Sequence, residues 1–544
     1  MAALEALAVL LHDRRLQPLE VVEGATRLYG PNFNKNFLKK IKMKRNYTFI
    51  LLLLCAFASA QNINDVLRMS GEGSYGTARF QGLNGAFGAL GGDLSSLSIN
   101  PAGSAVFNNS LLSFTGSNYN AKNDASYFNA SSNSSLNSVD LNQVGGVFVF
   151  KSTNSSSPWK KIALAFNYDL IKNFDDDLFV AGNSNQGIDN YFLDLANGVP
   201  FGPLLIQDGE YIEEAYLDIG ASLGFVDQQA FLGYYGGILD PVDFSDDNNT
   251  DYISNAKYST LNQNFSQSTA GYNSKFTANL ASQYGSNLYL GASLNIHSVF
   301  MDKLTRLSER GFDSNSEIQT IIFDNLLRTQ GNGFSFSLGA IGKLNENFRI
   351  GGSYQSPTWY NLSDETSQKI YSDLADSDIS FINFNIINVY EDYTIKIPGK
   401  LTGSLAVIFG QNGLISFDYG YQDMSKAELR PDSDPSFAAE NNFISNTLSS
   451  VSTFRLGGEY RILALSLRAG YRFEQSPYAN GETIGDLKGY SGGIGYNFGG
   501  SRLDLSYNYS AQDINKQLYD VGLPTPASIT NKNSVVSLGY TLNF

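Results

Sequence analysis

One histidine outside the N-terminal leader could serve in catalysis or in metal binding. The chain has two histidines, His12 and His297, so a Ser-His-Asp hydrolase or a haem-binding protein would have to use His297. Ser293 and Asn295 precede it by four and two residues, which puts the three side chains on one face of a strand. Neighbours on a strand face are about 7 Å apart, too far for a hydrogen bond between short side chains. We interpret His297 as a polar lining residue and predict that the protein is not an enzyme.

Two acidic runs could bind a divalent cation. One is Asp175–Asp177, and the other comprises Asp240, Asp243, Asp246, Asp247 and Asp251. The second run lacks the glycine and the glutamate that an EF-hand needs at positions six and twelve of its loop. The glycines at 85, 88 and 91 have no βαβ context that would make them a dinucleotide-binding motif. We therefore predict solvated loops, no cofactor and no dedicated metal site.

The composition favours a membrane β-barrel over a soluble enzyme. Charged residues make up 16% of the 544 residues, and the chain contains 52 Gly, 37 Phe and 32 Tyr. Barrels combine an apolar lipid-facing band with a polar lumen and polar loops, which gives this mixture. The formal net charge of −15 would repel nucleic-acid phosphates. We therefore exclude a nucleic-acid partner.

Apolar and polar residues alternate with a period of two from about residue 108 to the C-terminus. In 288–297, leucine and isoleucine alternate with small or polar residues, as in a strand between lipid and lumen. The count of such segments is 13 to 16, and a bacterial single-chain barrel needs an even number, so we predict 14 antiparallel strands. The last segment ends on an aromatic residue, which is typical of the strand that the barrel-assembly machinery recognises. Its alternating apolar residues are Val536, Leu538, Tyr540, Leu542 and Phe544.

The first 60 residues are not expected to belong to the fold. Residues 43–60 have a basic start, an apolar core and Ala58-Ser59-Ala60, the pattern of a signal peptide cleaved before Gln61. Residues 1–42 precede that signal, so we interpret them as a mis-annotated upstream extension. The one cysteine, Cys55, lies in the signal, and the remainder has no thiol to oxidise in the periplasm.

Residues 61–107 are predicted to form an ordered plug. Glycine and other small residues dominate 76–107, and such a composition suits backbone packed closely on other backbone. Apolar residues that recur every two to four positions argue against a flexible linker. The segment ends in the turn Asn100-Pro101-Ala102-Gly103.

The alternation breaks at about 173–269. Two helices are expected there, over 190–196 and 214–232, together with the second acidic run. Because periplasmic turns of bacterial barrels are short, we expect this insertion on the extracellular side, as a lid over the barrel 108–544.

The plug resembles the N-terminal hatch of FadL-type long-chain fatty acid transporters, in the form found in Bacteroidetes. The residues that carry the resemblance are Gly76-Thr77-Ala78-Arg79, Gly91-Gly92-Asp93 and Asn100-Pro101-Ala102-Gly103. Supporting similarities lie at Ser353–Thr358 and Gly413–Tyr419. The resemblance implies a 14-stranded outer-membrane barrel closed by a hatch, and passive uptake of hydrophobic compounds that leave sideways through the wall.

The resemblance also suggests roles for particular residues. Gly91, Gly92, Asp93 and the turn Asn100, Pro101, Ala102 and Gly103 would gate the hatch. The residues proposed to contact the ligand are Arg79, Phe80, Phe87 and His297. Hydrophobic small molecules, outer-membrane lipids, lipopolysaccharide and the barrel-assembly machinery are the expected partners.

Alternatives remain open from the sequence. Relatives of this type also carry haem or aromatic hydrocarbons, so the substrate is not fixed. A surface adhesin that acts through residues 173–269 is a second possibility, and a lipase or acyltransferase that uses His297 is a third.

Overall fold

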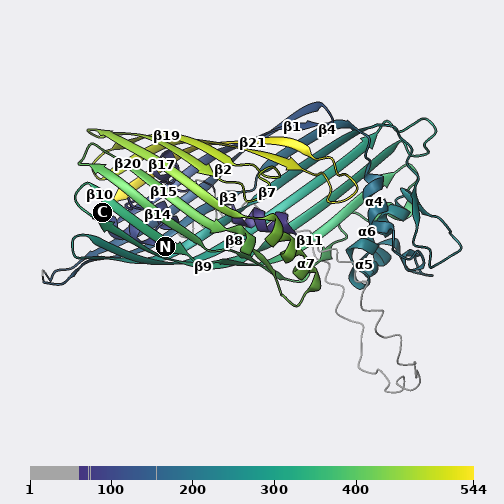
Figure 1. Cartoon of the computed structure of the whole chain (residues 1–544), viewed down its shortest axis with the longest axis horizontal. Helices are drawn as coiled ribbons and strands as arrows, with labels where there is room; N and C mark the ends of the chain where they lie inside the picture. The colour runs from purple at the N-terminus through teal and green to yellow at the C-terminus, as the bar shows by residue number, and fades with distance from the viewer. Residues whose placement is uncertain (1–60, 72, 74, 155) are drawn as a thin grey trace, which may run out of the picture. The chain divides into compact units, whose positions relative to one another are not determined.

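A computed structural model describes residues 61–544 except 72, 74 and 155 (Figure 1). The predictions for residues 1–42, for the signal peptide at 43–60 and for Cys55 lie outside the described residues. No helix in the described part of the chain is long and apolar enough to cross a membrane.

One antiparallel sheet closes on itself. The first strand, β1 (Leu111–Tyr127), pairs with β2 (Ala130–Lys151) on one side and with the last strand, β21 (Ala527–Asn543), on the other. Several barrel strands consist of two consecutive segments, namely β3 with β4, β10 with β11, β13 with β14 and β15 with β16. Counted this way, the described residues form 14 barrel strands, and the predicted fold class is confirmed.

The remaining strands have the following bounds: β3 (Trp159–Asn173), β4 (Asp176–Ser184), β7 (Leu261–Tyr284), β8 (Leu288–Arg310), β9 (Thr320–Lys343), β10 (Phe348–Gln355), β11 (Thr358–Ser372), β12 (Asn388–Val389), β13 (Tyr393–Ile397), β14 (Lys400–Phe409), β15 (Gly413–Asp423), β16 (Glu428–Arg430), β17 (Ser450–Ile462), β18 (Leu465–Glu474), β19 (Leu487–Asn497) and β20 (Ser501–Lys516). Short turns join them at one end of the barrel and long loops at the other. By the usual asymmetry of bacterial barrels, the long loops are extracellular.

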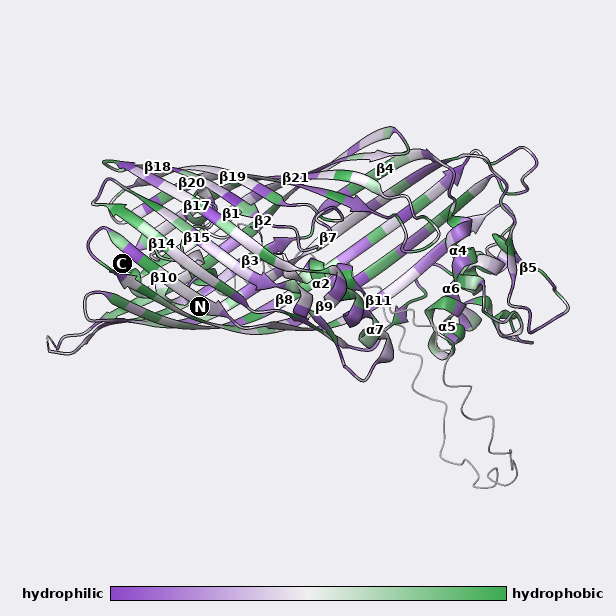
Figure 2. Cartoon of the chain, viewed as in Figure 1, coloured by the Kyte–Doolittle hydropathy of each residue, from purple (hydrophilic) through white to green (hydrophobic). Residues whose placement is uncertain are grey.

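The strands differ greatly in length. β7, β8 and β9 have 23 or 24 residues, whereas β14, β15 and β18 have 10 or 11. About 10 residues suffice to cross a membrane as a tilted strand. On β8 the outward side chains are apolar up to Phe300, apart from Ser298, and polar from Asp302 onward, apart from Leu304. The long strands therefore extend beyond the lipid on the extracellular side, and Figure 2 shows the alternation of apolar and polar residues along them.

The predicted break at 173–269 is shorter than expected. Two strands lie inside it, β4 and the first part of β7, so only 185–260 leaves the barrel. The helix predicted over 214–232 is two helices, because Gly224 interrupts it with φ +107°, a conformation that favours glycine. We call residues 185–260 the lid. Its elements are α4 (Ile188–Ala196), η3 (Gly202–Leu204), α5 (Ile212–Ser222), α6 (Phe225–Tyr235), β5 (Leu239–Pro241) and β6 (Tyr252–Ser254).

The lid packs on the extracellular ends of the long strands. Its buried apolar residues form one cluster with inward residues of β7, β8 and β9, including Phe265, Leu307 and Phe323. Side chains of the loop 517–526 complete the cluster. The lid is thus part of the barrel mouth. Between other strands lie η4 (Ser377–Phe381), η5 (Met424–Lys426) and α7 (Pro435–Thr447).

The segment 61–107, here called the hatch, fills the barrel. It comprises α2 (Ile63–Ser70), α3 (Ala78–Gly82), η1 (Leu94–Ser98) and η2 (Pro101–Val106). A capping box of Asn62 and Asp65 starts α2, and the side chains of Asp93 and Asn100 cap η1 and η2. Nearly every residue from 76 to 105 is buried.

Candidate functional site

The hatch lies backbone against backbone on the inner wall. A Cβ atom at Gly351 of β10 would lie 2.2 Å from the Gly88 carbonyl oxygen, and one at Gly291 of β8 would lie 2.4 Å from that of Pro101. Leu83 faces Gly457 and Gly470 in the same way. Because real Cβ atoms never come so close, these wall positions accept only glycine without movement of the hatch.

The first group of proposed gating residues forms a tight cross-contact. Gly91 and Gly92 have φ values of +59° and +67°, and a Cβ atom on Gly91 would lie 2.8 Å from the Cα of Gly103. The Gly92 N–H donates to the Gly103 carbonyl at 3.0 Å. Asp93 accepts hydrogen bonds from the Thr77 hydroxyl at 2.7 Å and from the Ser95 N–H at 3.0 Å.

The Asn100-Pro101-Ala102-Gly103 turn binds the hatch to the wall. The Asn100 amide donates to the carbonyls of Gly88 and Ala340 at 2.7 and 3.0 Å, while its oxygen accepts from the Ala102 N–H. Asn279 of β7 donates to the Pro101 carbonyl at 2.9 Å. The turn therefore connects two parts of the hatch to two barrel strands.

Arg79 serves as a buried anchor in this structure. Its Nε donates to Glu459 of β17 at 3.0 Å, and another guanidinium nitrogen donates to the Gly92 carbonyl at 3.1 Å. The guanidinium also lies over the ring of Phe87, which stacks on Phe80. Arg79, Phe80 and Phe87, predicted as ligand contacts, are thus packed within the hatch core.

Arg79→Met is expected to loosen the hatch. The variant leaves Glu459 paired with Arg468 and Arg461 but removes the hydrogen bonds from Arg79 to Glu459 and to the Gly92 carbonyl, which should destabilise the packed hatch by about 1–3 kcal/mol. Hydrogen exchange of the amides in 76–105 measures the effect. Arg461→Met is the control, since Arg461 binds the same Glu459 but is 39% exposed, and such pairs contribute at most about 1 kcal/mol. Equal protection in the two variants would contradict the anchoring role.

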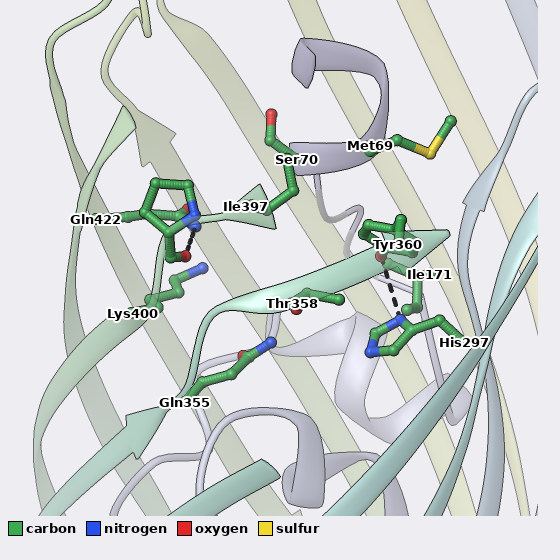
Figure 3. Close-up of a pocket in the computed structure, with 11 residues that line it drawn as sticks. Met69, Ser70, Ile171, His297, Gln355, Thr358, Tyr360, Ile397, Lys400 and Gln422 are labelled. Atoms are coloured by element: carbon green, nitrogen blue, oxygen red, sulfur yellow. Dashed lines mark hydrogen bonds between the residues drawn. The ribbon is translucent and has the colours of Figure 1, made fainter. Parts of the chain in front are cut away.

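His297 lies inside the barrel, on the same face as Ser293 and Asn295. All three are buried, as expected for lining positions. The ring bonds across strands: Nε2 lies 3.1 Å from the Ser335 hydroxyl and Nδ1 lies 3.2 Å from that of Tyr360 (Figure 3). A hydrolase would need a carboxylate where Tyr360 stands and an accessible serine, but Ser335 is fully buried.

The space next to His297 is small. A cavity of about 20 Å³ lies between the end of α2, the wall and His297 (Figure 3). That volume holds about one water, whereas pockets for organic ligands measure roughly 300–1,000 Å³. This part of the lumen is closed to a hydrophobic molecule unless α2 or another part of the hatch moves. The cavity is lined by Met69, Ser70, Ile171, His297, Gln355, Thr358, Tyr360, Ile397, Pro398, Lys400 and Gln422.

The barrel wall has a seam next to this cavity. The ladder between β2 and β3 ends at Gln143 and Asp169, so 130–142 of β2 has no ladder with 170–184 of β3 and β4. We call these facing stretches the seam. Side chains bridge its outer part: the Ser134 hydroxyl donates to the Asp177 carbonyl at 2.6 Å. A seam without a continuous ladder needs fewer backbone bonds broken to open.

The hatch covers the seam from the inside. The Gly73 N–H donates to the Ile171 carbonyl at 3.0 Å, and the Gly76 N–H donates to the Asn142 side chain at 3.0 Å. Lys172 donates through Nζ to the Arg68 carbonyl near the end of α2. A movement of α2 would therefore act directly on the seam.

Two lysines face the lumen above the hatch without an ion-pair partner. Lys303 of β8 and Lys516 of β20 lie close enough for their charges to interact with each other and with Arg68. Arg68 is paired with Asp65 at 2.7 Å, and Lys516 donates to the Gln267 amide oxygen. Among the described residues, the Lys303 ammonium has no hydrogen-bond partner.

Three carboxyl groups that make no ion pair lie close enough to one or both lysines to interact with them, those of Asp176, Asp364 and Asp520. Burial raises the pKa of Asp520, which lies in the loop 517–526. Neither lysine was predicted from the sequence as a site residue. The alternation along β8 could have pointed to Lys303, because odd-numbered residues such as His297 face inward there.

The second acidic run lies in the lid. The carboxylates of Asp243 and Asp246 accept hydrogen bonds from their own loop, at Ser245 and Asn248. In the part of the chain that the structure describes, no three His, Cys, Asp or Glu side chains are grouped as a metal site requires.

Known proteins agree with this architecture. The profile of the family described as outer membrane protein transport protein (OMPP1/FadL/TodX) matches residues 54–544. A Pseudomonas aeruginosa FadL homologue superposes with a TM-score of 0.50 at 12% identity, covering 87% of this chain and all of that one. No curated protein matches the sequence.

Two further solved structures are similar. The Pseudomonas putida toluene transporter TodX gives a TM-score of 0.47 at 12% identity and covers 87% of this chain and 99% of its own. The Ralstonia pickettii toluene transporter TbuX gives a TM-score of 0.43 at 14% identity, and the superposition covers 88% of this chain and 100% of that one. The match to the family profile extends over nearly the whole barrel and hatch. The chain belongs to the FadL/TodX family of outer-membrane transport proteins, and it is a transporter of hydrophobic compounds and not an enzyme.

Proposed function

We propose that this protein takes up long-chain fatty acids, or amphiphiles with a similar anionic head. The observation that carries the proposal is the pair Lys303 and Lys516, which face the lumen without ion pairs. A carboxylate can form charge-assisted hydrogen bonds with the ammonium groups of both lysines, which an uncharged hydrocarbon cannot do. Haem is disfavoured because both ring nitrogens of His297 already contact hydroxyl groups.

The proposed path begins at the mouth. Apolar side chains directly after α5 and in 373–392 are exposed there, and α5 packs beside η4. These exposed residues are Leu223, Phe381, Phe384, Ile387 and Val389. They would collect an acyl chain before the head group reaches Lys303.

The path ends at the seam. The hatch residues Gly91 to Gly103 bind the wall tightly and would block a straight route to the periplasm. An acyl chain gains about 0.8 kcal/mol for each methylene that stays out of water, which favours sideways release into the membrane. In this scheme α2 moves, the seam opens, and the rest of the hatch stays in place.

Binding of oleate and of oleyl alcohol to the purified barrel tests the head-group assignment. The double variant Lys303→Met with Lys516→Met should bind oleate about tenfold more weakly than the wild type, because one charged hydrogen bond contributes roughly 1.5–3 kcal/mol. Its affinity for oleyl alcohol should be unchanged. Lys426→Met is the control, since the side chain of this lysine is 74% exposed. An equal loss for both ligands would contradict the assignment. Binding of toluene but not of oleate by the wild type would favour aromatic hydrocarbons.

A further inference from the structure

The outer faces of β20, β21, β1 and β2 form ordered cross-strand rows. Pairing places Leu503, Tyr540 and Phe114 side by side, and the next rows toward the loops contain Leu505 with Leu538 and Tyr507 with Val536. These side chains are 41–54% exposed on a membrane barrel, so they are the lipid contact.

The outward side chains of these rows change abruptly from apolar to mostly polar beyond Tyr507, toward the long loops. The rows from Tyr509 to Asn515 and their partners contain serine, threonine, asparagine, aspartate and lysine, with Ala511 as the apolar exception. We call these outward side chains the collar. Its members are Asn120, Lys122, Asp124 and Ser126 on β1, Ser131, Asn133, Ser135 and Asn137 on β2, Tyr509, Ala511, Asp513 and Asn515 on β20, and Ser528, Thr530, Lys532 and Ser534 on β21.

The collar has a fixed position relative to the membrane. It continues directly from the lipid-contact rows on the same strands, toward the end with the long loops. On the extracellular side, the head-group layer of the outer leaflet borders the acyl chains of the lipids. The collar therefore faces lipid head groups and not the lumen.

Two lysines stand directly opposite each other in this layer. Lys122 of β1 pairs in register with Lys532 of β21, and like charges in this arrangement destabilise a sheet. Asp124 lies between them, 3.2 Å from Lys122 and 2.7 Å from Lys532. The trio has a net charge of +1, and the carboxylate of Asp513 in the next row lies close enough to Lys532 for their charges to interact. The side chains of the two lysines are 48% and 37% exposed.

A groove lies just above the lysines. It measures about 520 Å³ and is lined by collar residues that include Asp124, Asn133, Asp513, Asn515 and Thr530. Carboxylates, amides and hydroxyls are the groups that hydrogen-bond to sugar hydroxyls. Two lysines at the membrane boundary with a polar groove above them match a head group whose phosphate is attached to a sugar.

We propose that the collar binds the phosphorylated sugar head group of an outer-leaflet glycolipid, of the lipopolysaccharide type. Lys122 and Lys532 hold a phosphate, and the groove accepts the adjoining sugar. The acyl chains then lie on Leu538, Tyr540 and Phe114. This site is on the outside of the barrel and is separate from the lumenal path of the transported compound.

Titration of fluorescent diphosphorylated lipid A into the barrel in detergent micelles tests the proposal. The wild type should bind it, and Lys122→Gln with Lys532→Gln should bind it about thirtyfold more weakly. Each lysine near an anionic lipid surface contributes about fivefold. Dephosphorylated lipid A should bind weakly to both proteins. The control Lys257→Gln with Lys426→Gln removes two exposed lysines from outside the collar and should bind like the wild type.

A second variant removes the ambiguity that Asp124 creates. The double variant leaves this carboxylate unpaired, so Asp124→Asn is added to it as a neutral triple variant. Weak binding by both variants supports the lysines as phosphate ligands. Wild-type binding by the triple variant, or equal binding of lipid A with and without phosphate, would overturn the proposal. Oleate binding by the same variants should remain unchanged, and it reports that the barrel is folded.

Discussion

Gly351→Ala is expected to make the barrel leak, whereas Gly352→Ala, one residue further on, is expected to leave it closed. The new methyl group at 351 would meet the Gly88 carbonyl at 2.2 Å, while a methyl at 352 has no atom within 4 Å. A backbone carbonyl in a packed hatch cannot move alone, and such overpacking costs about 1–3 kcal/mol. The displaced hatch should then be populated roughly tenfold to a hundredfold more.

Conductance of single barrels in planar bilayers measures this effect. The wild type and Gly352→Ala should conduct little, and Gly351→Ala should show frequent openings. Gly291→Ala should behave like Gly351→Ala, because it presses on Pro101. A silent Gly351→Ala barrel that folds normally would mean that the hatch adjusts without opening a path.

Closing the seam with a cross-link is expected to reduce uptake at least tenfold. The side chains of Ser138 and Asn173 lie 3.3 Å apart across the seam, and no described residue is a cysteine. Ser138→Cys with Asn173→Cys therefore gives two unique thiols in the mature barrel, which a short bifunctional reagent can join. The bridge holds the two edges together at the place where the ladder is missing.

The matched control is Ser117→Cys with Ser537→Cys. Their hydroxyls are 2.6 Å apart, but they join β1 to β21, where the ladder is complete. Cross-linking this pair should leave uptake unchanged. Full uptake through a barrel bridged at 138 and 173 would contradict sideways release at the seam.

The barrel could be predicted from the sequence because its pattern is local. Alternation in segments such as 288–297 depends only on one face meeting lipid and the other meeting the lumen. It also placed His297 on the inside. The bounds of the lid were less accurate, because the start of β7 has only polar residues on its outer face and β4 mixes polar and apolar residues on its outer face. Such strands have no apolar alternation to reveal them.

The hatch was predictable in kind but not in detail. Its glycines indicated close backbone packing, and Gly88 and Gly91 do pack in this way. The wall glycines that face the hatch, Gly291 and Gly351, are brought against it by the register of strands far away in the chain. Local sequence patterns do not contain that register. Arg79 was expected to contact a ligand because it is charged. Its actual partner, Glu459, lies 380 residues away in the sequence, so local patterns do not reveal the ion pair.

Lys303 was missed for a different reason. A single lysine on a strand is common, and its significance comes from facing the lumen near Lys516 without a carboxylate partner. That juxtaposition arises only when β8 and β20 are placed around one barrel. The polar face of the collar was likewise invisible until the cross-strand register aligned Lys122 with Lys532.

The most direct measurement is uptake of fluorescent long-chain fatty acid by cells that lack other transporters of this kind. Cells with the wild type are compared with cells that express Asn100→Ala and Pro101→Ala, at equal surface levels. The account predicts saturable uptake by the wild type and a lower rate in the variant, because Asn100 joins Gly88 of the hatch to Ala340 of the wall and so keeps in place the surface that directs the ligand sideways to the seam. No uptake by a folded, surface-exposed wild-type barrel would contradict the proposed substrate.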